Sequence, residues 1–321
     1  MKVLVCKEAG NIESLCIVDR EISDPKDNQV QIKVKAVSLS TSDIAPFTQK
    51  IEEDTVSFAA KLMVNNKALG GDISGIITKV GKRVNHLKVG DEVYSAIGVN
   101  GGCCEFVNVN ANKVFIKPNN LNFEQAASIP TSAIVAMEAC KKAKIHKDTK
   151  VLIYGSSGGV GTMCLQIAKA MGATITAVCS TRNVQTMYEL GASHVIDYKK
   201  ENIENHTETY NVILGVNGNI KLSTYKRLLS AHGTYIAIGG KSATAGILGP
   251  LYALGSNKHM SFVLFAFAQN HGHLNTITSM IENNEIQIQL ESVFTPKEAK
   301  EKIQQIAIHH TKGKNVIKTE F

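Results

Sequence analysis

The sequence predicts a two-domain α/β protein in which a small antiparallel barrel or sandwich precedes a doubly wound parallel sheet. Three observations carry this prediction. The chain has 321 residues, which is more than one ordinary core accommodates. The residues before Asn122 are strand-like and punctuated by turns. After Asn122, strand-like and helix-like segments alternate, which is typical of parallel sheets.

Composition places the chain among globular proteins. It is 44% hydrophobic and 20% charged, with 25 Gly and 6 Pro, which excludes disorder, collagen and coiled coil as the main architecture. The longest unbroken apolar run, residues 262–268, is too short for a membrane-spanning helix. The first residues also lack the apolar stretch of an export signal. We therefore expect a cytoplasmic protein without a membrane span.

Cysteine usage and net charge limit the classes of function that the chain could have. The seven cysteines form no CxxC pair and are expected to be reduced thiols. The net charge of +7 comes from scattered lysines in a chain with 6% aromatic residues, whereas nucleic-acid readers cluster their cations. We expect no nucleic acid as the main partner. A side role in binding single-stranded RNA rests only on this net charge and would require a steep salt dependence.

The first part of the chain is expected to form short strands. Gln29–Ala36 alternates polar and apolar residues at period two, the pattern of a half-buried strand. Asp72–Val80 and Asp91–Tyr94 continue this style, and glycines mark turns between the strands. Such a segment predicts the small barrel or sandwich.

From Asn122 onward the pattern changes. Glu124–Ala143 is expected to be a helix, with Asn122 as its cap and Pro130 as a kink. The strands expected after it are Lys150–Tyr154, Thr174–Cys179, His194–Asp197, Asn211–Val216 and Thr234–Ile238, with helices at Gly159–Met171, Asn183–Leu190 and Lys221–Ser230. Beyond Gly255 the alternation loosens, leaving helices at Leu274–Asn283 and within Pro296–His310.

The most informative stretch is Val151–Gly172, an apolar strand, a loop and an amphipathic helix. The loop carries Gly155, Gly158, Gly159 and Gly161. A pyrophosphate site needs small residues here, because the chain must turn sharply, approach the anion closely and leave backbone N–H groups free at a helix N-terminus. A strand and a helix flank the glycines, so we expect a dinucleotide site.

The charges after the second strand of this unit indicate which dinucleotide binds. An NAD site normally offers Asp or Glu about 20 residues after the glycines. Here the position reads Ser180, Thr181 and Arg182, and no Asp or Glu occurs from Thr149 to Tyr188. Two hydroxyls and a guanidinium suit a ribose 2′-phosphate. The alternative is that Arg182 is a solvated residue at a helix N-terminus, where the helix dipole disfavours a cation. We expect NADP(H).

The segments GSSGGVGTMCLQIAKAMGA and TAVCSTRNVQTMYELGASHVIDY resemble the zinc-free quinone oxidoreductase branch of the medium-chain dehydrogenase/reductases. LGGDISGIITKVGKRVNHLKVGDEVYS, EQAASIPTSAIVAMEA and HTKGKNVI extend the resemblance. It implies a GroES-like β-barrel domain at residues 1–122 and 266–321, an inserted doubly wound Rossmann domain at residues 123–265, a cleft between them and a homodimer. The residues that it implies line the cofactor are Ser156, Gly158, Gly159, Val160, Ser180, Arg182, Tyr198, Lys312 and Gly313.

The zinc-containing relatives hold their metal with an early cysteine and a Gly-His-Glu segment. In this chain the corresponding positions read Ser40 and Gly71-Asp72, and neither Ser nor Gly replaces a thiolate or an imidazole as a zinc ligand. Cys103 and Cys104 are adjacent, a spacing that does not wrap a tetrahedral ion. We therefore expect no metal.

Without zinc, a hydride is delivered more easily to acceptors that spread the developing charge, namely quinones or carbonyl-conjugated C=C bonds. The resemblance places Ser40, Thr41 and Asp43 in the substrate pocket. Asp43 matches only the last residue of the family's Asn-Pro-x-Asp motif, and a structural role as a cap or turn residue is its alternative. No catalytic acid is identified.

The leading hypothesis is an NADPH-dependent, zinc-independent reductase of quinones or α,β-unsaturated carbonyl compounds. One alternative is a non-catalytic NADPH-binding redox sensor or scaffold. Another is a zinc-type alcohol dehydrogenase.

Overall fold

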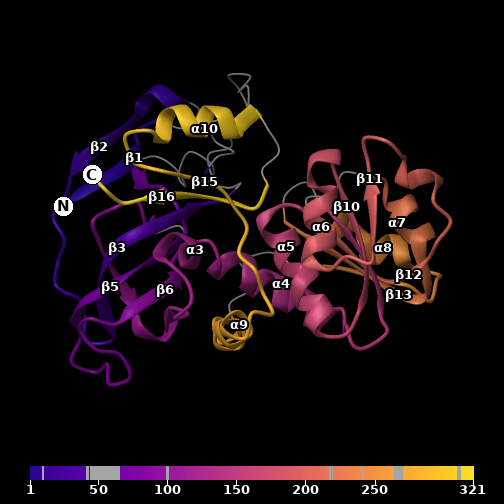
Figure 1. The fold of residues 1–321 in the computed structure, drawn as a ribbon, viewed down its shortest axis with the longest axis horizontal. Coiled ribbons are helices and arrows are strands. Elements are labelled where there is room, and N and C mark those ends of the chain that lie inside the picture. Colours follow the sequence, from indigo (N-terminus) through magenta and orange to yellow (C-terminus); the bar gives the residue numbers. More distant parts are fainter. Residues whose placement is uncertain are drawn as a thin grey trace. The chain divides into compact units, whose positions relative to one another are not determined.

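The structure is a computed structural model of the chain. It describes residues 1–8, 11–40, 43, 66–98, 101–216, 218, 220–239, 242–263, 270–308 and 312–321. Thr41 and residues 264–268 of the apolar run therefore lie outside the described residues. The chain divides into two compact units, Met1–Thr131 with Ile288–Phe321, and Ser132–Gln287 (Figure 1).

The first unit contains two β-sheets. Its strands are β1 (Lys2–Cys6), β2 (Leu15–Asp19), β3 (Gln29–Leu39), β4 (Lys67–Ala68), β5 (Asp72–Val80), β6 (Glu92–Ala96), β7 (Phe106–Asn110), β8 (Val114–Ile116), β15 (Leu290–Phe294) and β16 (Lys314–Lys318). The larger sheet has seven strands in the order β15-β16-β3-β5-β6-β8, with β7 also paired to β3, and the smaller has the order β2-β1-β4. Apart from the parallel pair β15–β16, neighbouring strands are antiparallel. The predicted strand at Gln29–Ala36 is confirmed as the central strand β3.

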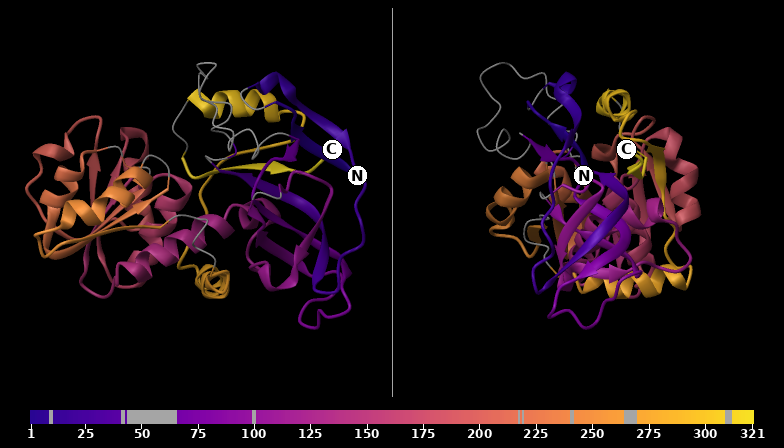
Figure 2. Two further views of the ribbon diagram at one scale, coloured as in Figure 1. Left: turned by 180° about the vertical axis from the view of Figure 1, so that it is seen from behind. Right: turned by 90° about the vertical axis from the view of Figure 1, so that its left-hand side faces the viewer.

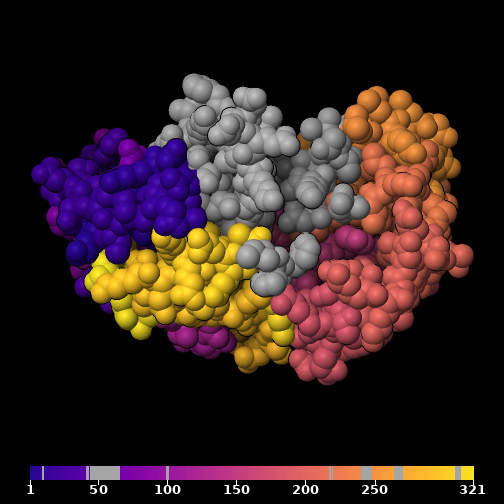
Figure 3. Space-filling model, turned by 90° about the horizontal axis from the view of Figure 1, so that it is seen from above, coloured from indigo at the N-terminus to yellow at the C-terminus, as the bar shows by residue number. Residues whose placement is uncertain are grey.

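Helices cover this unit. They are α3 (Phe123–Ala127) and α10 (Ala299–Ile308), with short 3-10 helices η1 (Ile12–Ser14) and η3 (Ala111–Lys113). Helix α10 lies beside the N-terminal strands, as the yellow and indigo surfaces in Figure 3 show. Its Ile303 is buried in the same core cluster as Val3, and Lys300 forms an ion pair with Glu13. Residues from the N-terminal and C-terminal parts of the chain therefore pack together in the first unit.

The second unit is a doubly wound parallel sheet. Its strands, in the spatial order β11-β10-β9-β12-β13-β14, are β11 (His194–Asp197), β10 (Thr174–Cys179), β9 (Lys150–Tyr154), β12 (Tyr210–Val216), β13 (Leu229–Ile238) and β14 (His259–Val263). The helices are α4 (Pro130–Lys142), which begins in the first unit, α5 (Gly159–Ala170), α6 (Val184–Leu190), α7 (Leu222–Leu228), α8 (Ser242–Ala253) and α9 (His273–Glu282), with η4 (Thr181–Asn183) and η5 (Ile203–Asn205). Helices α5 and α6 contact each other on one face of the sheet, and α7 and α8 on the other (Figures 1 and 2).

The predicted bounds of β9, β10 and β11 are confirmed, and the structure differs from the sequence prediction at Pro130. Asn122 caps α3 in a capping box with Gln125, as predicted for this residue. Pro130 does not kink one long helix but begins a second one, because proline has no N–H to lose at a first helical position.

The unit boundaries fall later in the chain than residues 122 and 265. Helix α3 belongs to the first unit because Phe123 and Ala127 pack with Ala36 and Val316. Helix α9 belongs to the second, where its buried His273 bonds to α4. In the described part of the chain, no helix is both long and apolar enough to cross a membrane.

Candidate functional site

The turn after β9 has a backbone that only glycine fits at two positions. Gly155 has φ +76°, and a Cβ on it would lie 2.2 Å from the Val216 carbonyl oxygen. A Cβ on Gly161 would lie 2.2 Å from the Gly155 carbonyl oxygen. The turn and the first residues of α5 are therefore in direct backbone contact, as the sequence pattern predicts.

Gly158, the N-cap of α5, differs from these two glycines. A Cβ built on it would lie 4.0 Å from the nearest atom, the Gly155 carbonyl oxygen, so the protein itself leaves room for a side chain. Glycine cannot cap the helix with a side chain, and the Thr162 N–H is bonded back to the Gly158 carbonyl at 2.9 Å. The N–H groups before Thr162, in the first turn of α5, are the donors that an anion at a helix N-terminus uses.

Ser156 points into the unit. Its hydroxyl donates to the Val178 carbonyl at 3.0 Å, and its backbone N–H and that of Gly155 bond to the same oxygen at 3.2 Å. The side chain is completely buried. Ser156 therefore attaches the glycine-rich turn to β10 through both its hydroxyl and its backbone N–H, and its predicted contact with the cofactor stays a prediction. The predicted contacts of Gly159 and Val160, which are half-buried, stay predictions.

The segment after β10 lies at the edge of the sheet beside this turn, because β10 pairs with β9. Ser180 is the N-cap residue of η4 and accepts a hydrogen bond from the buried Asn183 side chain at 3.2 Å. Thr181 and Arg182 are exposed. Both hydroxyls and the guanidinium predicted to receive a 2′-phosphate thus stand at the carboxyl end of β10.

A carboxylate that the sequence interpretation missed, Asp197, lies next to this segment. It ends β11 and is paired in register with Cys179 at the end of β10. Although desolvation acts in the opposite direction, hydrogen bonds from the Thr181 hydroxyl and the Lys199 N–H, together with the charge of Lys200, lower the pKa of Asp197. The Lys199 N–H lies 3.0 Å and the Lys200 ammonium 3.9 Å from its oxygens. The alternation of strands was the available signal, because parallel neighbours end at one edge.

The remaining predicted cofactor residues fall in both units. Tyr198 follows β11, is partly exposed, and has the Lys199 ammonium 5.7 Å from its ring centre. Lys312 and Gly313 precede β16 in the first unit, where Lys312 is half-buried. Gly313 has φ +74°, and a Cβ on it would lie 2.2 Å from the Gln289 carbonyl oxygen. Glycine is thus required there by the backbone.

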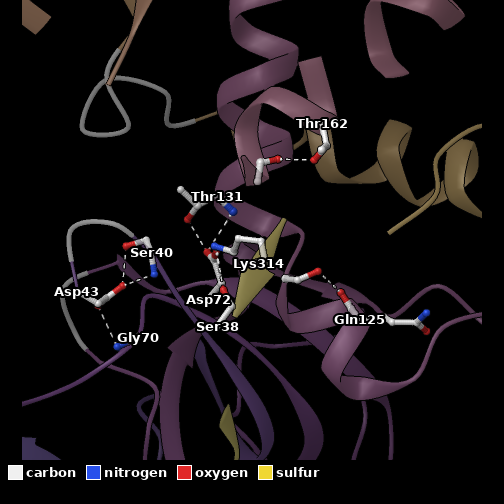
Figure 4. Close-up of polar contacts among 11 residues, drawn as sticks. Ser38, Ser40, Asp43, Gly70, Asp72, Gln125, Thr131, Thr162 and Lys314 are labelled. Atoms are coloured by element: carbon white, nitrogen blue, oxygen red, sulfur yellow. Dashed lines mark hydrogen bonds and ion pairs between the residues drawn. The ribbon is translucent and has the colours of Figure 1, made fainter. Parts of the chain in front are cut away.

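Two of the predicted substrate-pocket residues form a compact hydrogen-bonded turn (Figure 4). One Asp43 carboxylate oxygen accepts from the Ser40 N–H at 2.7 Å and from the Ser40 hydroxyl at 2.5 Å. The other accepts from the Gly70 N–H at 3.0 Å. Both oxygens of Asp43 therefore hold backbone in place, which is the structural role that the sequence left as its alternative. Thr41 lies outside the described residues.

Asp72, at the position of the missing zinc-ligand segment, is the centre of a buried polar cluster (Figure 4). One of its oxygens accepts from the Thr131 N–H at 3.1 Å and from the Thr131 hydroxyl. The other lies 3.5 Å from the Lys314 ammonium and 3.4 Å from the Ser38 hydroxyl. Desolvation raises the pKa of Asp72, and the Lys314 charge and the Thr131 hydrogen bonds oppose this rise. We call these four residues the Asp72 cluster.

The donor chemistry of these positions does not fit zinc. Ser40 is bonded to Asp43, Asp72 to the ammonium of Lys314, and neither offers the sulfur or imidazole nitrogen that zinc prefers. Among the residues that the structure describes, no three His, Cys, Asp or Glu side chains meet as a metal site. The expectation of no metal stays a prediction.

The residues of the second unit do fit a dinucleotide. The glycine-rich turn has no room for a Cβ at Gly155 or Gly161, whereas Gly158 leaves space in front of the uncapped first turn of α5. A pyrophosphate at that helix N-terminus would fill this space, and Ser180, Thr181 and Arg182 follow the end of the neighbouring strand β10, where they could contact the ribose.

Known proteins resemble the chain over nearly its whole length. The family model for the alcohol dehydrogenase GroES-like domain matches residues 26–119, and the one for zinc-binding dehydrogenases matches residues 190–317. The mitochondrial NAD(P)H oxidoreductase RTN4IP1 of Bos taurus is 32% identical, over 90% of this chain and 81% of that protein. The chloroplastic NADPH-dependent alkenal/one oxidoreductase of Arabidopsis thaliana is 31% identical, over 68% of this chain and 58% of that protein.

A solved structure extends the likeness to the fold. The quinone oxidoreductase from Coxiella burnetii superposes with a TM-score of 0.86 at 26% identity, covering 99% of both chains. The GroES-like and Rossmann-type architecture expected from the resemblance is thereby confirmed. The chain belongs to the medium-chain dehydrogenase/reductase superfamily and, within it, to the quinone oxidoreductase-like proteins.

Proposed function

We propose that this protein is an NADPH-dependent oxidoreductase that reduces quinones or α,β-unsaturated carbonyl compounds by hydride transfer and without zinc. The observation that carries the proposal is the charge beside the glycine-rich turn. Arg182 and two hydroxyls follow β10, and Asp197, which ends the neighbouring strand β11, accepts hydrogen bonds from Thr181 and Lys199 and lies 3.9 Å from the Lys200 ammonium. A 2′-phosphate would meet the Arg182 guanidinium and the Ser180 hydroxyl here, whereas the Thr181 hydroxyl donates its proton to Asp197.

Different residues would contact different parts of the cofactor. The first turn of α5 and Gly158 would face the pyrophosphate, and Ser180, Thr181 and Arg182 the adenosine ribose and its phosphate. The bound nicotinamide supplies the hydride. The names of the relatives from Arabidopsis and Coxiella, an alkenal/one oxidoreductase and a quinone oxidoreductase, support acceptors whose charge spreads over conjugated bonds.

The first unit would contribute positioning rather than a strong acid. Asp43 accepts hydrogen bonds from Ser40 and Gly70, and Asp72 is held by Thr131 and Lys314. Each oxygen of both carboxylates therefore already has a partner. We therefore assign the proton that completes the reduction to solvent. An acceptor that develops a delocalised enolate or hydroquinone oxygen needs only hydrogen-bond donors nearby.

A test combines turnover with metal content. The purified, untagged protein should oxidise NADPH in the presence of a quinone or an enone, should remain active after dialysis against a chelator, and should contain no stoichiometric zinc. One zinc per chain that is needed for activity would contradict the proposal and favour a zinc-type alcohol dehydrogenase.

A second candidate function is non-catalytic NADPH binding, as in a redox sensor or scaffold. It is favoured by Asp43, whose two oxygens are both committed to Ser40 and Gly70. This candidate predicts tight NADPH binding with no oxidation of NADPH by any acceptor in a broad panel of quinones and enones. Turnover with any of them rejects it.

We further propose a homodimer and a cytoplasmic location. Strand β14 forms one edge of the parallel sheet, where a second copy could continue the hydrogen bonding. Light scattering of the purified protein would give the mass of a dimer. The Bos taurus relative is named as mitochondrial, so fractionation of cells between cytosol and mitochondria is the measurement that decides the compartment.

A further inference from the structure

A cavity of about 740 Å³ lies at the edge of the parallel sheet opposite the glycine-rich turn. It is lined by residues at or near the amino ends of strands, among them Thr149 before β9, Val212 in β12 and His259 in β14. The proposed dinucleotide site lies at the opposite edge of the sheet, at the carboxyl ends of β9 and β10. The volume is within the range of about 300–1,000 Å³ that small-molecule sites occupy. None of the residues assigned above to the cofactor or the substrate lines this cavity.

The lining is rich in cations. Lys142, Lys144 and Lys147 contribute three positive charges against the single negative charge of Asp148, the acidic residue among the described lining residues, so the cavity carries a formal charge of +2 with neutral histidines. His232 and His259 add ring nitrogens that can donate hydrogen bonds, and His146 donates its Nδ1 proton to the Lys147 carbonyl at 2.8 Å. The lysines come from α4 and the loop after it, and two of the histidines from β13 and β14. Distant segments thus bring their basic side chains to one place.

Left-handed backbone conformations gather at the same cavity. Of the five non-glycine residues with positive φ in the described ranges, three line it: Lys144 at 53°, Asp148 at 66° and His232 at 60°. Lys144 follows the end of α4, where the Ile145 N–H bonds back to the Cys140 carbonyl and where helices commonly place glycine. Lysine is strained in this conformation, and such strain clusters at ligand sites, whereas Asp and His adopt it more readily.

Helix capping explains only part of this arrangement. Lysines near the carboxyl end of a helix are favoured by its dipole, which accounts for Lys142, whose ammonium donates to the Phe262 carbonyl at 2.9 Å. It does not account for His232 and His259, which lie on separate strands. The floor is amphipathic, because Val212 and Ile236 alternate with the hydroxyl of Thr234. Such a floor accepts an organic group as well as an anion.

We propose that this cavity binds a small, soluble phosphorylated anion, at a site separate from the dinucleotide site. Phosphate oxygens would accept from the lysines and histidines at the rim, and the organic part would lie on the strand floor. Two or more negative charges are needed to match the lining, which selects a diphosphate or bisphosphate over a monoanion.

Calorimetry of the full chain with inorganic pyrophosphate, in the presence of saturating NADPH, tests the proposal. NADPH fills the dinucleotide site, so the expected result is saturable binding of one pyrophosphate per chain. In the same protein without substitutions, pyrophosphate should protect Lys144 and Lys147 from an amine-modifying reagent. Absence of saturable binding overturns the proposal, and so does binding that leaves both lysines unprotected.

Variants locate the bound anion. Lys144→Asn with His232→Asn removes two basic groups while keeping a residue that tolerates positive φ, and it should weaken pyrophosphate binding by roughly tenfold or more. The matched control Lys221→Asn changes an exposed lysine of the same unit outside the cavity and should leave binding unchanged. Equal affinity in all three proteins overturns the site. Binding to phosphoinositide vesicles without binding to free pyrophosphate overturns the assignment to a soluble ligand.

Discussion

At the scale of single residues, three glycines of one loop have different physical reasons for being glycine. Gly155 and Gly161 are required by the protein, because a Cβ on either would overlap a carbonyl oxygen at 2.2 Å. Gly158 is not, because its nearest neighbour would be 4.0 Å away. The sequence pattern alone treats all of them as equivalent. Only the structure separates those that form the turn from the one that leaves space for a ligand.

This difference predicts opposite outcomes for two alanine variants. Gly161→Ala should lower the free energy of unfolding by about 1–3 kcal/mol, because backbone atoms must move, and should impair NADPH binding as well. Gly158→Ala should unfold at the parental temperature but bind NADPH more weakly, because its methyl group occupies the space in front of the helix N-terminus. Thermal unfolding and NADPH fluorescence titration measure both. A Gly158→Ala protein with parental affinity would place the pyrophosphate elsewhere.

At the scale of elements, the Asp72 cluster joins parts of the first unit that are distant in sequence. Asp72 begins β5, Lys314 begins β16, Ser38 lies near the end of β3, and Thr131 lies in the first turn of α4. Lys314 directly follows the predicted cofactor residues Lys312 and Gly313. The ion pair therefore fixes the start of β16, directly after these two residues.

A double-mutant cycle measures this pair. Asp72→Asn or Lys314→Met should each cost about 3–5 kcal/mol in the free energy of unfolding, because each leaves a buried partner unpaired. The double variant should lose less free energy of unfolding than the two single variants lose together. Lys79→Met, which removes an ion pair between exposed side chains at 2.5 Å, should cost at most about 1 kcal/mol. Additive effects in urea unfolding would contradict the coupling.

The same pair predicts a pH dependence. Because desolvation raises the pKa of Asp72 above its ordinary value of 3.8, the folded state holds this proton at a pH where the unfolded state has lost it. Stability from this group therefore decreases as the pH rises through that window. Lys314→Met removes the charge that opposes the shift, so the stability of this variant relative to the parent should fall as the pH rises above 3.8. A constant difference would contradict this.

Elements with strong apolar patterns could be predicted from the sequence, and others could not. Strands β9, β10 and β11 are short apolar runs bounded by polar residues and turns, so their bounds were readable. Helix α8 and strand β14 were missed. Gly249 and Pro250 lower the helix propensity of α8, and polar residues at 259 and 261 interrupt the apolar pattern of β14.

At the scale of the whole molecule, the structure reveals features that depend on the order and register of the strands. The resemblance predicted the barrel and the inserted parallel sheet, and the fold confirms them. The alternation of strands indicated that Asp197 ends at the same edge as Thr181, but their pairing and the basic cavity at the opposite edge depend on the strand order, which the sequence pattern does not give. The glycine-rich turn was predictable because all its parts are local.

Thiol chemistry gives a prediction for the entire chain. All seven cysteines are free, and six are buried, leaving Cys16 partly exposed. Desolvation raises the pKa of Cys104 to about 12 and of Cys179 to about 11, so at pH 8 roughly one thiol in a thousand or fewer is the reactive thiolate at these sites. Ellman's reagent should titrate at most one cysteine rapidly in the native protein and seven after denaturation. Rapid reaction of several native thiols would contradict the buried arrangement.

The central claim is that the second unit holds a 2′-phosphorylated dinucleotide through the end of β10. Titration of NADPH and NADH into the parent protein and into Arg182→Ala tests it most directly, with Lys221→Ala as a control of equal charge change. NADPH should bind the parent more tightly than NADH, and Arg182→Ala should weaken NADPH by roughly tenfold or more while leaving NADH unchanged. Tighter NADH binding by the parent, or equal loss for both nucleotides, would contradict the account.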